Sequence, residues 1–297
     1  MRHDRSGTHG RGVVTMNLTF LGTGAAEGYP NPFCRCGNCE RARALGGPSL
    51  RVRSAALIND DLLIDLGPDL IAASHAHGLP LTDVRYCLQT HAHADHLDTS
   101  HLLSRSPEYG VPDAPRLHVY ASTATVQRAA QLLEADLAPA GLLDPAVGER
   151  LNVAIQQIEP LQPFSAGPYR VTAFPANHGP EGEALLYAIE AEGRSLFYGT
   201  DTGPFPEETW RALRRHGLRF DAVILDHTYG YVHGPGDHLD AYQFVEHVAR
   251  LREEGLLAGD ARVFATHLAH ETNPPHPELA EIAGRHGYEV AYDGLTV

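Results

Sequence analysis

The chain has 297 residues, of which 43% are hydrophobic, and a net charge of −14 with its 19 histidines neutral. This composition is typical of a folded chain with a hydrophobic core and excludes an intrinsically disordered protein. The acidic balance argues against long nucleic acids and anionic membranes as partners, and the apolar runs are too short to span a bilayer. We therefore expect a cytoplasmic protein.

The N-terminal residues, Met1–Thr15, are polar and rich in Gly and Arg, so we expect a disordered extension that ends where folding begins, at Met16. Short apolar or β-branched runs then predict strands near Asn17–Phe20, Ala55–Ile58, Leu62–Asp65, Tyr86–Gln89, Leu117–Tyr120, Tyr169–Phe174, Leu185–Ile189, Ser195–Tyr198, Ala222–Leu225, Arg262–Ala265 and Glu289–Tyr292. Helical patterns predict helices near Pro68–His77, Ala124–Leu137, Pro206–His216, Ala241–Glu254 and Pro277–His286.

These elements alternate without a Gly-x-Gly-x-x-Gly fingerprint, which favours an α/β fold of two sheets covered by helices. No Pro/Gly/Ser-rich linker divides the chain. The segment Pro139–Gly148 is the best candidate boundary, although an ordinary loop explains it. We predict a single domain over residues 16–297.

The densest functional signal is His91-Ala92-His93-Ala94-Asp95-His96, shortly after the mostly apolar run Val84–Leu88. Imidazoles and carboxylates hold Zn, Mn or Fe with open coordination positions. His91 and His93 alternate along an extended segment and can bind one ion together, whereas Asp95 and His96 are displaced toward a second. The pattern predicts a catalytic metal site rather than a loop of solvated histidines.

Three more candidate ligands each come just after a predicted strand: His178, Asp201 and His267. An exposed loop position is the alternative for the two histidines. A helix N-cap is the alternative for Asp201, whose carboxylate could otherwise bridge two metals.

The order of these motifs resembles the metallo-β-lactamase-fold hydrolase superfamily: His-Ala-His-Ala-Asp-His after a strand, an isolated His, Gly-Thr-Asp-Thr-Gly and Ala-Thr-His. The resemblance covers the chain from Phe20 to the end and implies a four-layer αβ/βα sandwich with a dinuclear site between its sheets. It implies that the first metal is held by His91, His93 and His178. The second would be held by Asp95, His96 and His267, with Asp201 bridging the two.

A second cluster, Cys34-Arg35-Cys36-Gly37-Asn38-Cys39, places three thiols close together and predicts a zinc site that lacks one ligand. A disulfide is the alternative. It would leave an odd thiol, because the remaining cysteine, Cys87, lies in a predicted core strand. His270, three residues after His267, is the candidate fourth ligand, so that one short segment would serve both sites.

The segment Cys34–Cys39, called the cysteine hook below, occurs together with the motif Thr-His-x-x-His at Thr266–His270. This combination resembles the cyclic-phosphate phosphodiesterases of the carbon–phosphorus lyase pathway and their relatives. These relatives include metallo-β-lactamase-fold proteins associated with pyrroloquinoline quinone synthesis. This resemblance implies a structural zinc held by Cys34, Cys36, Cys39 and His270. It also implies that His238 protonates the leaving group, although the segment from His238 to His267 is longer here. His233 competes for that role, and an ordinary histidine at a helix start is the alternative for both.

Asp65 lies at the end of a predicted strand. It resembles a recurrent carboxylate of the superfamily, and we interpret it as orienting a metal-bound histidine. A helix N-cap is the alternative for this residue.

These residues predict a dinuclear metal-dependent hydrolase. The leading substrate class is small phosphodiesters, which include cyclic phosphates. Two divalent ions, Zn or Mn with Fe as a further choice, would make hydroxide from a bridging water and clamp the phosphodiester oxygens. The catalytic set is Asp95, Asp201 and His238, in which Asp201 fixes the hydroxide and His238 is the general acid. With the structural zinc, we expect about three metals per chain.

Two alternatives remain open. The same nucleophile would serve a hydrolase of another ester, a thioester or a lactone, and a non-catalytic metal-binding accessory protein of cofactor biosynthesis would need the ligands without turnover. We expect a small anionic substrate as the partner, no long nucleic acid and no membrane. The sequence leaves the oligomeric state open, a homodimer included.

Overall fold

The structure is a computed structural model that describes residues 16–137, 141–179 and 183–297. Its first sheet contains β1 (Leu18–Gly22), β2 (Ala55–Ile58), β3 (Leu62–Ile64), β4 (Tyr86–Leu88), β5 (Leu117–Ala121) and β6 (Val153–Gln157). Its second sheet contains β7 (Pro163–Ala166), β8 (Tyr169–Pro175), β9 (Leu185–Ala191), β10 (Arg194–Gly199), β11 (Phe220–Asp226), β12 (Leu257–Thr266) and β13 (Glu289–Val290). The helices are α1 (Gly37–Leu45), α2 (Leu70–His77), α3 (Ser100–Ser104), α4 (Thr123–Leu137), α5 (Pro145–Leu151), α6 (Glu207–His216), α7 (Ala241–Glu253) and α8 (His276–Arg285).

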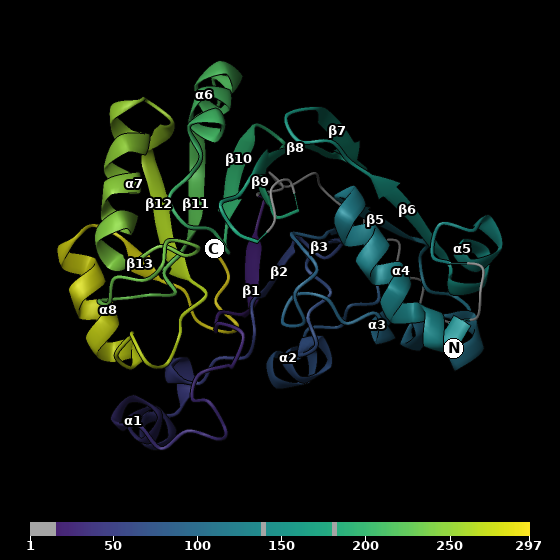
Figure 1. Cartoon of the computed structure of the whole chain (residues 1–297), viewed down its shortest axis with the longest axis horizontal. Helices are drawn as coiled ribbons and strands as arrows, with labels where there is room; N and C mark the ends of the chain where they lie inside the picture. Colours follow the sequence, from purple (N-terminus) through teal and green to yellow (C-terminus); the bar gives the residue numbers. More distant parts are fainter. Residues whose placement is uncertain (1–15, 138–140, 180–182) are drawn as a thin grey trace, which may run out of the picture.

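Within the described residues the strands pair in the orders β1-β2-β3-β4-β5-β6 and β13-β12-β11-β10-β9-β8-β7. Strands β3 to β6 are parallel, and so are β10 to β13, whereas β1, β2, β7, β8 and β9 pair antiparallel. The two sheets face each other, with α6, α7 and α8 outside one and α2, α4 and α5 outside the other (Figure 1). The predicted α/β sandwich of four layers is confirmed.

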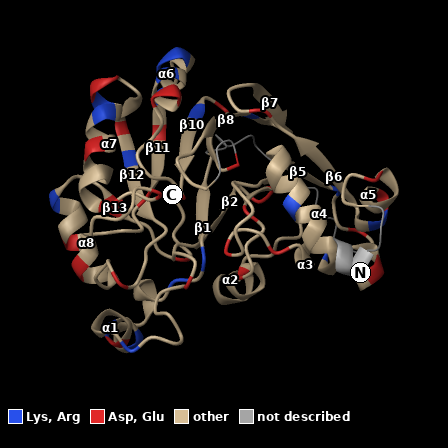
Figure 2. Ribbon diagram, in the orientation of Figure 1, with Lys and Arg blue, Asp and Glu red and all other residues tan. Residues whose placement is uncertain are grey.

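Side chains from both sheets fill the central layer. Phe20 of β1 and Phe264 of β12 meet there with ring centroids 5.8 Å apart, and Tyr187 and Tyr198 are fully buried. Parallel strands are apolar on both faces because a second core lies under the helices on each outer side, for instance where Trp210 of α6 packs on the second sheet. Charged residues of both signs are interspersed along α6, α7 and α8 (Figure 2).

The predicted strands and helices are present, with boundaries shifted by a few residues. The structure also contains elements that the sequence did not predict, among them β6, β7 and α1. Strands β6 and β7 are short edge strands with polar residues, so they lack the continuous apolar run of a central strand. The start of α1 is set by Cys36, whose sulfur accepts a hydrogen bond from the amide of Cys39, and this cap was not recognised in the sequence. None of the described helices is both long enough and apolar enough to cross a bilayer.

Two expectations about chain organisation stay predictions. The expected extension Met1–Thr15 lies outside the described residues. The candidate boundary Pro139–Gly148 lies partly outside them, and its last residues are helical rather than loop, because α5 begins at Pro145 with Asp144 as its N-cap.

A buried arginine ties the first sheet to the C-terminal segment. Arg51 donates hydrogen bonds to Oγ1 of Thr23 at 2.7 Å and to Nδ1 of His276 at 3.0 Å. Burial, and then the positive charge of Arg51, lower the pKa of His276 from 6.5 to about 4. The folded state therefore resists protonation of this ring, and His276 contributes stability that is present above pH 6.5 and is lost as the pH falls toward 4.

We expect the free energy of unfolding of the protein to fall over that window. Exchanging His276 for Gln should reduce the fall by on the order of 1–2 kcal/mol after allowance for solvent screening. Urea unfolding of both proteins between pH 7 and pH 4 measures this difference. Parallel curves for the two proteins would contradict it.

Candidate metal centre

The candidate ligands gather at one end of the sandwich, where strands of both sheets finish. Asp65 directly follows β3, and the segment 91–96, called the ligand loop below, follows β4. In the second sheet His178 follows β8, Asp201 follows β10 and His267 follows β12. Because β10 and β12 run parallel to β11, their carboxyl ends meet at the same edge.

Three of these residues have an uncommon backbone conformation. Asp65, Asp201 and His267 have φ angles of 68°, 51° and 58°, in the left-handed region that few residues other than glycine adopt. Each such residue costs on the order of 1–3 kcal/mol and persists only where the surrounding structure enforces it. Strained residues of this kind cluster at functional sites, which agrees with the candidate role of this edge.

The candidate ligands named from the sequence form two groups at this edge, and within each group the possible ligand atoms lie within 4.8 Å of one another. A further set of this kind joins Asp201 and His267 to Asp226 and His238. The first group is His91, His93 and His178, and the second is Asp95, His96, Asp201 and His267. Asp201 also approaches the first group, since its Oδ2 lies 3.7 Å from Nε2 of His91 while its Oδ1 lies 3.1 Å from Nε2 of His267. The structure thus brings together all seven residues, with Asp201 between the two groups.

The carboxylate of Asp65 fixes the ring of His96. It is fully buried and accepts hydrogen bonds from Nδ1 of His96 at 2.6 Å and from the amide of Thr90 at 2.7 Å. The remaining nitrogen of His96, Nε2, therefore faces the second group. Asp65 is not a helix cap, because the N-cap residue of α2 is Asp69.

Two other histidines are oriented in the same way. Nδ1 of His178 donates to the carbonyl of Asp237 at 3.1 Å, and Nδ1 of His267 donates to Oγ1 of Thr228 at 2.8 Å. Each ring therefore presents Nε2 to its group. Asp201 is not the N-cap of α6 either, since Pro206 holds that position.

The donor atoms of both groups fit divalent cations. Nε2 of His178 lies 3.0 Å from Nδ1 of His93, and Nε2 of His96 lies 3.4 Å from Nε2 of His267, so ring nitrogens converge in each group. Nε2 of His91 is buried and has no hydrogen-bond partner among the described residues. Convergent imidazole and carboxylate donors with an orphaned buried nitrogen are what a Zn- or Mn-type ion requires.

The electrostatics of the second group favour a bound cation. Burial opposes ionisation of Asp201, but the rings of His267 and His96 outweigh it and hold the pKa of Asp201 well below its usual range. Burial likewise opposes protonation of His96, yet Asp201, Asp65 and Asp95 raise its pKa. The carboxylate of Asp201 is thus ionised, and its negative charge attracts positive charge to this point.

A residue that the sequence did not reveal, Gln89, holds the ligand loop closed. Its side chain is 1% exposed. Its Nε2, which carries two hydrogens, lies 3.0 Å from Oδ1 of Asp65 and 2.9 Å from the carbonyl oxygens of both His91 and His96, so these three acceptors share two N–H groups. Its Oε1 accepts from the amide of Leu66 at 3.1 Å. One amide thus fixes both ends of the ligand loop to the strand end that carries Asp65.

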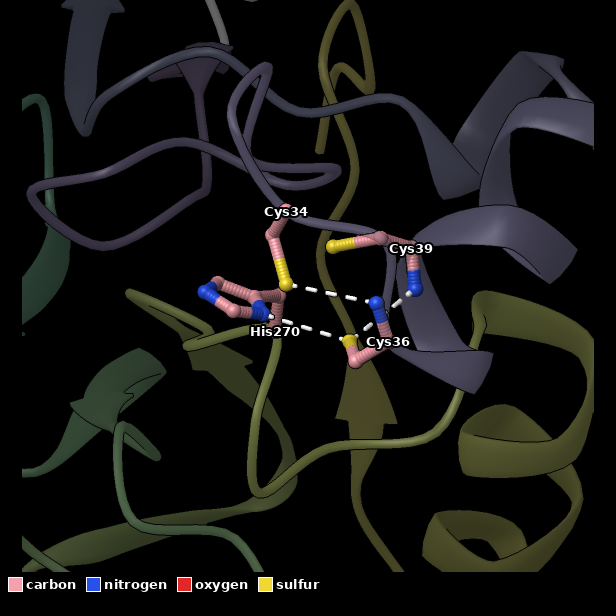
Figure 3. Close-up of side chains that lie close together, drawn as sticks. All are labelled: Cys34, Cys36, Cys39 and His270. Carbon is pink, nitrogen blue, oxygen red and sulfur yellow. Dashed lines mark hydrogen bonds between the residues drawn. The ribbon is translucent and has the colours of Figure 1, made fainter.

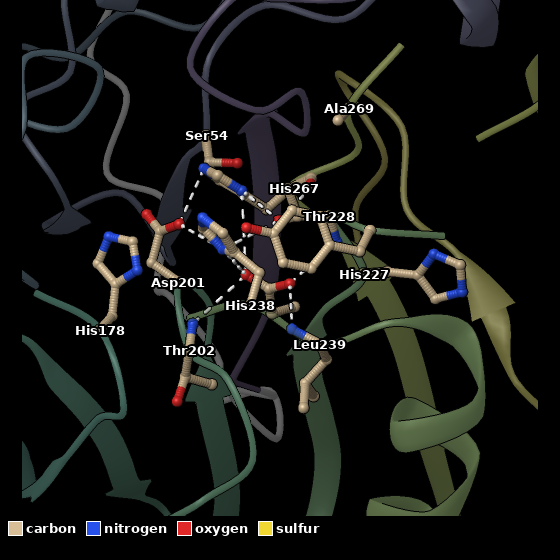
Figure 4. Close-up of polar contacts among 12 residues, drawn as sticks. Ser54, His178, Asp201, Thr202, His227, Thr228, His238, Leu239, His267 and Ala269 are labelled. Carbon is tan, nitrogen blue, oxygen red and sulfur yellow. Dashed lines mark hydrogen bonds and ion pairs between the residues drawn. The ribbon is translucent and has the colours of Figure 1, made fainter. Parts of the chain in front are cut away.

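His238 lies beside the second group, and Asp226 anchors it. Nδ1 of His238 is 2.8 Å from Oδ2 of Asp226, and its ring stacks on that of His267 with centroids 5.5 Å apart (Figure 4). Burial would lower the pKa of His238, but the charge of Asp226 outweighs it and raises the pKa to about 9. Asp226 itself is buried and accepts from the amide of Thr228 at 2.9 Å. The sequence had given Asp226 no role.

Two neighbouring histidines are directed elsewhere. The side chain of His233 is 78% exposed and contacts Oδ2 of Asp240 at 2.6 Å. His227 points away from the ligand groups in Figure 4, and its Nδ1 lies 2.9 Å from Oδ1 of Asn273. Of the two candidates for the general acid, only His238 joins the ligand residues.

The cysteine hook and His270 also come together (Figure 3). Their donor atoms lie within 4.8 Å of one another, and all three thiols are free. Sγ of Cys36 is 3.5 Å from Nδ1 of His270. Although burial raises the pKa of Cys36, the amide of Cys39 and the ring of His270 outweigh it and lower the pKa to about 6. A thiolate at neutral pH is the form that binds zinc.

Comparisons with known proteins agree with this geometry. The beta-lactamase superfamily domain matches residues 61–268. Coenzyme PQQ synthesis protein B of Cupriavidus taiwanensis is 27% identical over 94% of this chain and 98% of its own length. Among solved structures, a diphosphatase from the PhnP family is similar with a TM-score of 0.72, at 22% identity over 95% of this chain and 97% of its own.

A second solved structure, Zn(2+)-bound PqqB from Methylobacterium extorquens, is similar with a TM-score of 0.65, at 19% identity over 95% of this chain and 99% of its own. At these identities a structural likeness shows the fold alone. The domain match, by contrast, spans most of the chain and includes the ligand loop, His178, Asp201 and His267. The chain therefore belongs to the beta-lactamase superfamily and has the metallo-β-lactamase fold.

Proposed function

We propose that this protein is a dinuclear metal-dependent hydrolase of a small, anionic phosphodiester, cyclic phosphates included. The observation that carries the proposal is the pair of ligand groups with Asp201 between them and His238 beside them. The similar PhnP-family structure is that of a diphosphatase, which supports a phosphorus-containing substrate.

In this proposal each ligand group would hold one divalent ion, Zn or Mn with Fe as a further choice. The first ion would be held by His91, His93 and His178, the second by Asp95, His96 and His267, and Asp201 would serve both. When bound, two such ions supply hydroxide at neutral pH and neutralise charge on the phosphoryl oxygens. The protein's own part is to fix the donor atoms, through Asp65, Thr228 and Gln89, and to deliver a proton to the leaving group.

His238 is the proposed proton donor. Nδ1 is held by Asp226, whose charge raises the pKa of His238, so Nε2–H is the proton proposed to pass to a departing oxygen. Asp226 is a positioning residue, because it acts through His238 and does not touch the substrate.

The role of His238 is tested by the leaving group. We expect His238→Gln to slow hydrolysis of an alkyl phosphodiester by about 10²–10⁴-fold, the usual contribution of a general acid. Hydrolysis of bis-p-nitrophenyl phosphate should slow far less, because nitrophenolate departs without a proton. Asp226→Asn should give the same pattern in a weaker form, and His233→Gln should leave both rates unchanged. Equal losses on the two substrates would remove His238 from the role.

The substrate class is tested by a panel assayed with the Zn- or Mn-loaded protein. It comprises a bis-aryl phosphodiester, 2′,3′-cyclic nucleotides, acyl esters, thioesters and lactones, with His91→Ala as the background. We expect phosphodiester rates well above that background. If only the acyl esters, thioesters or lactones are hydrolysed, the protein is a hydrolase of acyl substrates and the phosphodiester proposal is wrong.

A second candidate function is a metal-binding accessory role in cofactor biosynthesis. The curated relatives that match along 94% of the chain favour it, since they are coenzyme PQQ synthesis proteins. It predicts bound metal without turnover of any substrate in the panel. The complete set of seven candidate ligand residues favours catalysis, because a metal-binding accessory protein can lose members of such a set.

The cysteine hook is proposed to bind a structural zinc that fixes the N-terminal loop to the segment carrying His267. We expect about three metals per chain, of which one resists mild chelation. Cys36→Ser should lose that one and lower the unfolding temperature by several degrees. Metal analysis and calorimetry measure both effects, with Cys87→Ala as the control that keeps all three metals. An unchanged metal count in Cys36→Ser would contradict the site.

A further inference from the structure

A cavity of about 640 Å³ opens on the outer side of the first sheet, and no residue of either ligand group lines it. Leu63 of β3 and Leu117 of β5 line it, together with Leu70 and Ile71 of α2. Its polar lining is sparse, and its volume is within the range of about 300–1,000 Å³ of small-molecule sites. A cavity of this kind favours a ligand with an apolar body.

One cation in the cavity wall has no counter-charge. Arg105, at the end of α3, is partly buried and donates to the carbonyl of Asn152 at 3.0 Å and to that of Pro115. Among the described residues no carboxylate forms an ion pair with Arg105 or raises its pKa. Asp113 also lines the cavity, but it is exposed and makes no ion pair with Arg105.

A guanidinium has five N–H donors, and the two carbonyls of Asn152 and Pro115 do not use them all. Leaving a half-buried cation unpaired is costly, and a carboxylate matches the geometry of the guanidinium fork. An anionic group at Arg105, attached to a hydrocarbon body that lies on the leucines, would satisfy both features of the cavity.

We propose that this cavity binds an apolar organic anion, namely a carboxylate with a hydrocarbon chain. The carboxylate lies at Arg105, and the chain covers the side chains of Leu63, Leu70 and Leu117. The site is separate from the metal centre, so its occupation is measured as binding and needs no catalytic assay.

The charge requirement is tested with three ligands of equal chain length on the metal-loaded protein. In titration calorimetry we expect octanoate to bind one per chain and at least about tenfold more tightly than octan-1-ol, a difference of about 1.4 kcal/mol. Octylamine should not bind. Equal affinities for the three ligands would overturn the anionic specificity. Acetate, as a control, shows whether a carboxylate alone binds at the metals.

The location is tested with variants in the cavity wall. Arg105→Gln should reduce the affinity for octanoate to that for octan-1-ol, and Arg105→Lys should restore part of it. Val111→Trp, at a position that is 38% exposed in the cavity wall, should reduce octanoate binding at least about tenfold by filling the space. Leu132→Trp, at a 40% exposed position on α4 outside the cavity, is the matched control and should bind normally.

Two results would overturn the proposal. Octanoate binding that survives both Val111→Trp and Arg105→Gln would place the ligand elsewhere, for instance at the metals. Light scattering that shows a dimer split by octanoate or by Val111→Trp would identify the cavity as an interface between two copies of the chain. Should Arg105→Gln not fold, Arg105→Lys and Val111→Trp still decide the outcome.

Discussion

Exchange of Asp201 for Asn is expected to remove hydrolysis almost entirely, lowering kcat/KM by at least about 10³-fold, or about 4 kcal/mol of transition-state stabilisation. The carboxylate lies between the two ligand groups, 3.7 Å from Nε2 of His91 and 3.1 Å from Nε2 of His267. An amide has the same shape but no charge. The measurement is kcat/KM for bis-p-nitrophenyl phosphate, with metal content determined on the same sample.

The loss should not come from unfolding, because Asn tolerates the left-handed backbone at position 201 better than most residues. Asp260→Asn, at an exposed position on β12, is the matched control and should keep full activity. Retention of more than a tenth of the activity by Asp201→Asn would show that this carboxylate is dispensable.

Exchange of Gln89 for Leu should have the second-largest effect. The variant keeps the size of the side chain but leaves the carbonyls of His91 and His96 and the amide of Leu66 without their partner. Each buried group left unpaired costs about 1–3 kcal/mol, so we expect a loss of about 3 kcal/mol or more in stability. We also expect active-site metals to bind about 10–100-fold more weakly, as for other groups that orient metal ligands.

Urea unfolding and titration of the metal-free protein with Co(II) separate these two effects. A purely structural role would lower stability while the affinity and visible spectrum of bound Co(II) stay unchanged. Gln162→Leu, at an exposed position, is the control. Wild-type stability together with wild-type Co(II) affinity in Gln89→Leu would show that the polar contacts of the Gln89 side chain have no role at the site.

The residues of the site that could be predicted are those that lie close together in the sequence. The ligand loop carries four candidate ligands in six residues, and His267 and His270 are three residues apart, so their chemistry is visible without a structure. Asp201 could be placed with them through the resemblance, and the structure brings it between the two groups.

Gln89 and Asp226 could not be recognised, because their roles depend on contacts between distant segments. Gln89 reaches Asp65 across 24 positions of sequence, and Asp226 reaches His238 across 12. A glutamine or an aspartate at the end of a strand does not by itself indicate a contact with a distant segment. The same reason hides β6 and β7, whose pairing with neighbouring strands, rather than their own composition, makes them strands.

The left-handed backbone at Asp65, Asp201 and His267 affects which substitutions would stabilise this protein. Glycine at any of these positions would relieve strain, so a lineage released from selection for the reaction could become more stable by losing these side chains. The presence of carboxylate and imidazole side chains at all three positions, in spite of this cost, agrees with the proposed function. A programme of stabilising substitutions should leave these positions untouched, since a rise in melting temperature there would come with loss of the site.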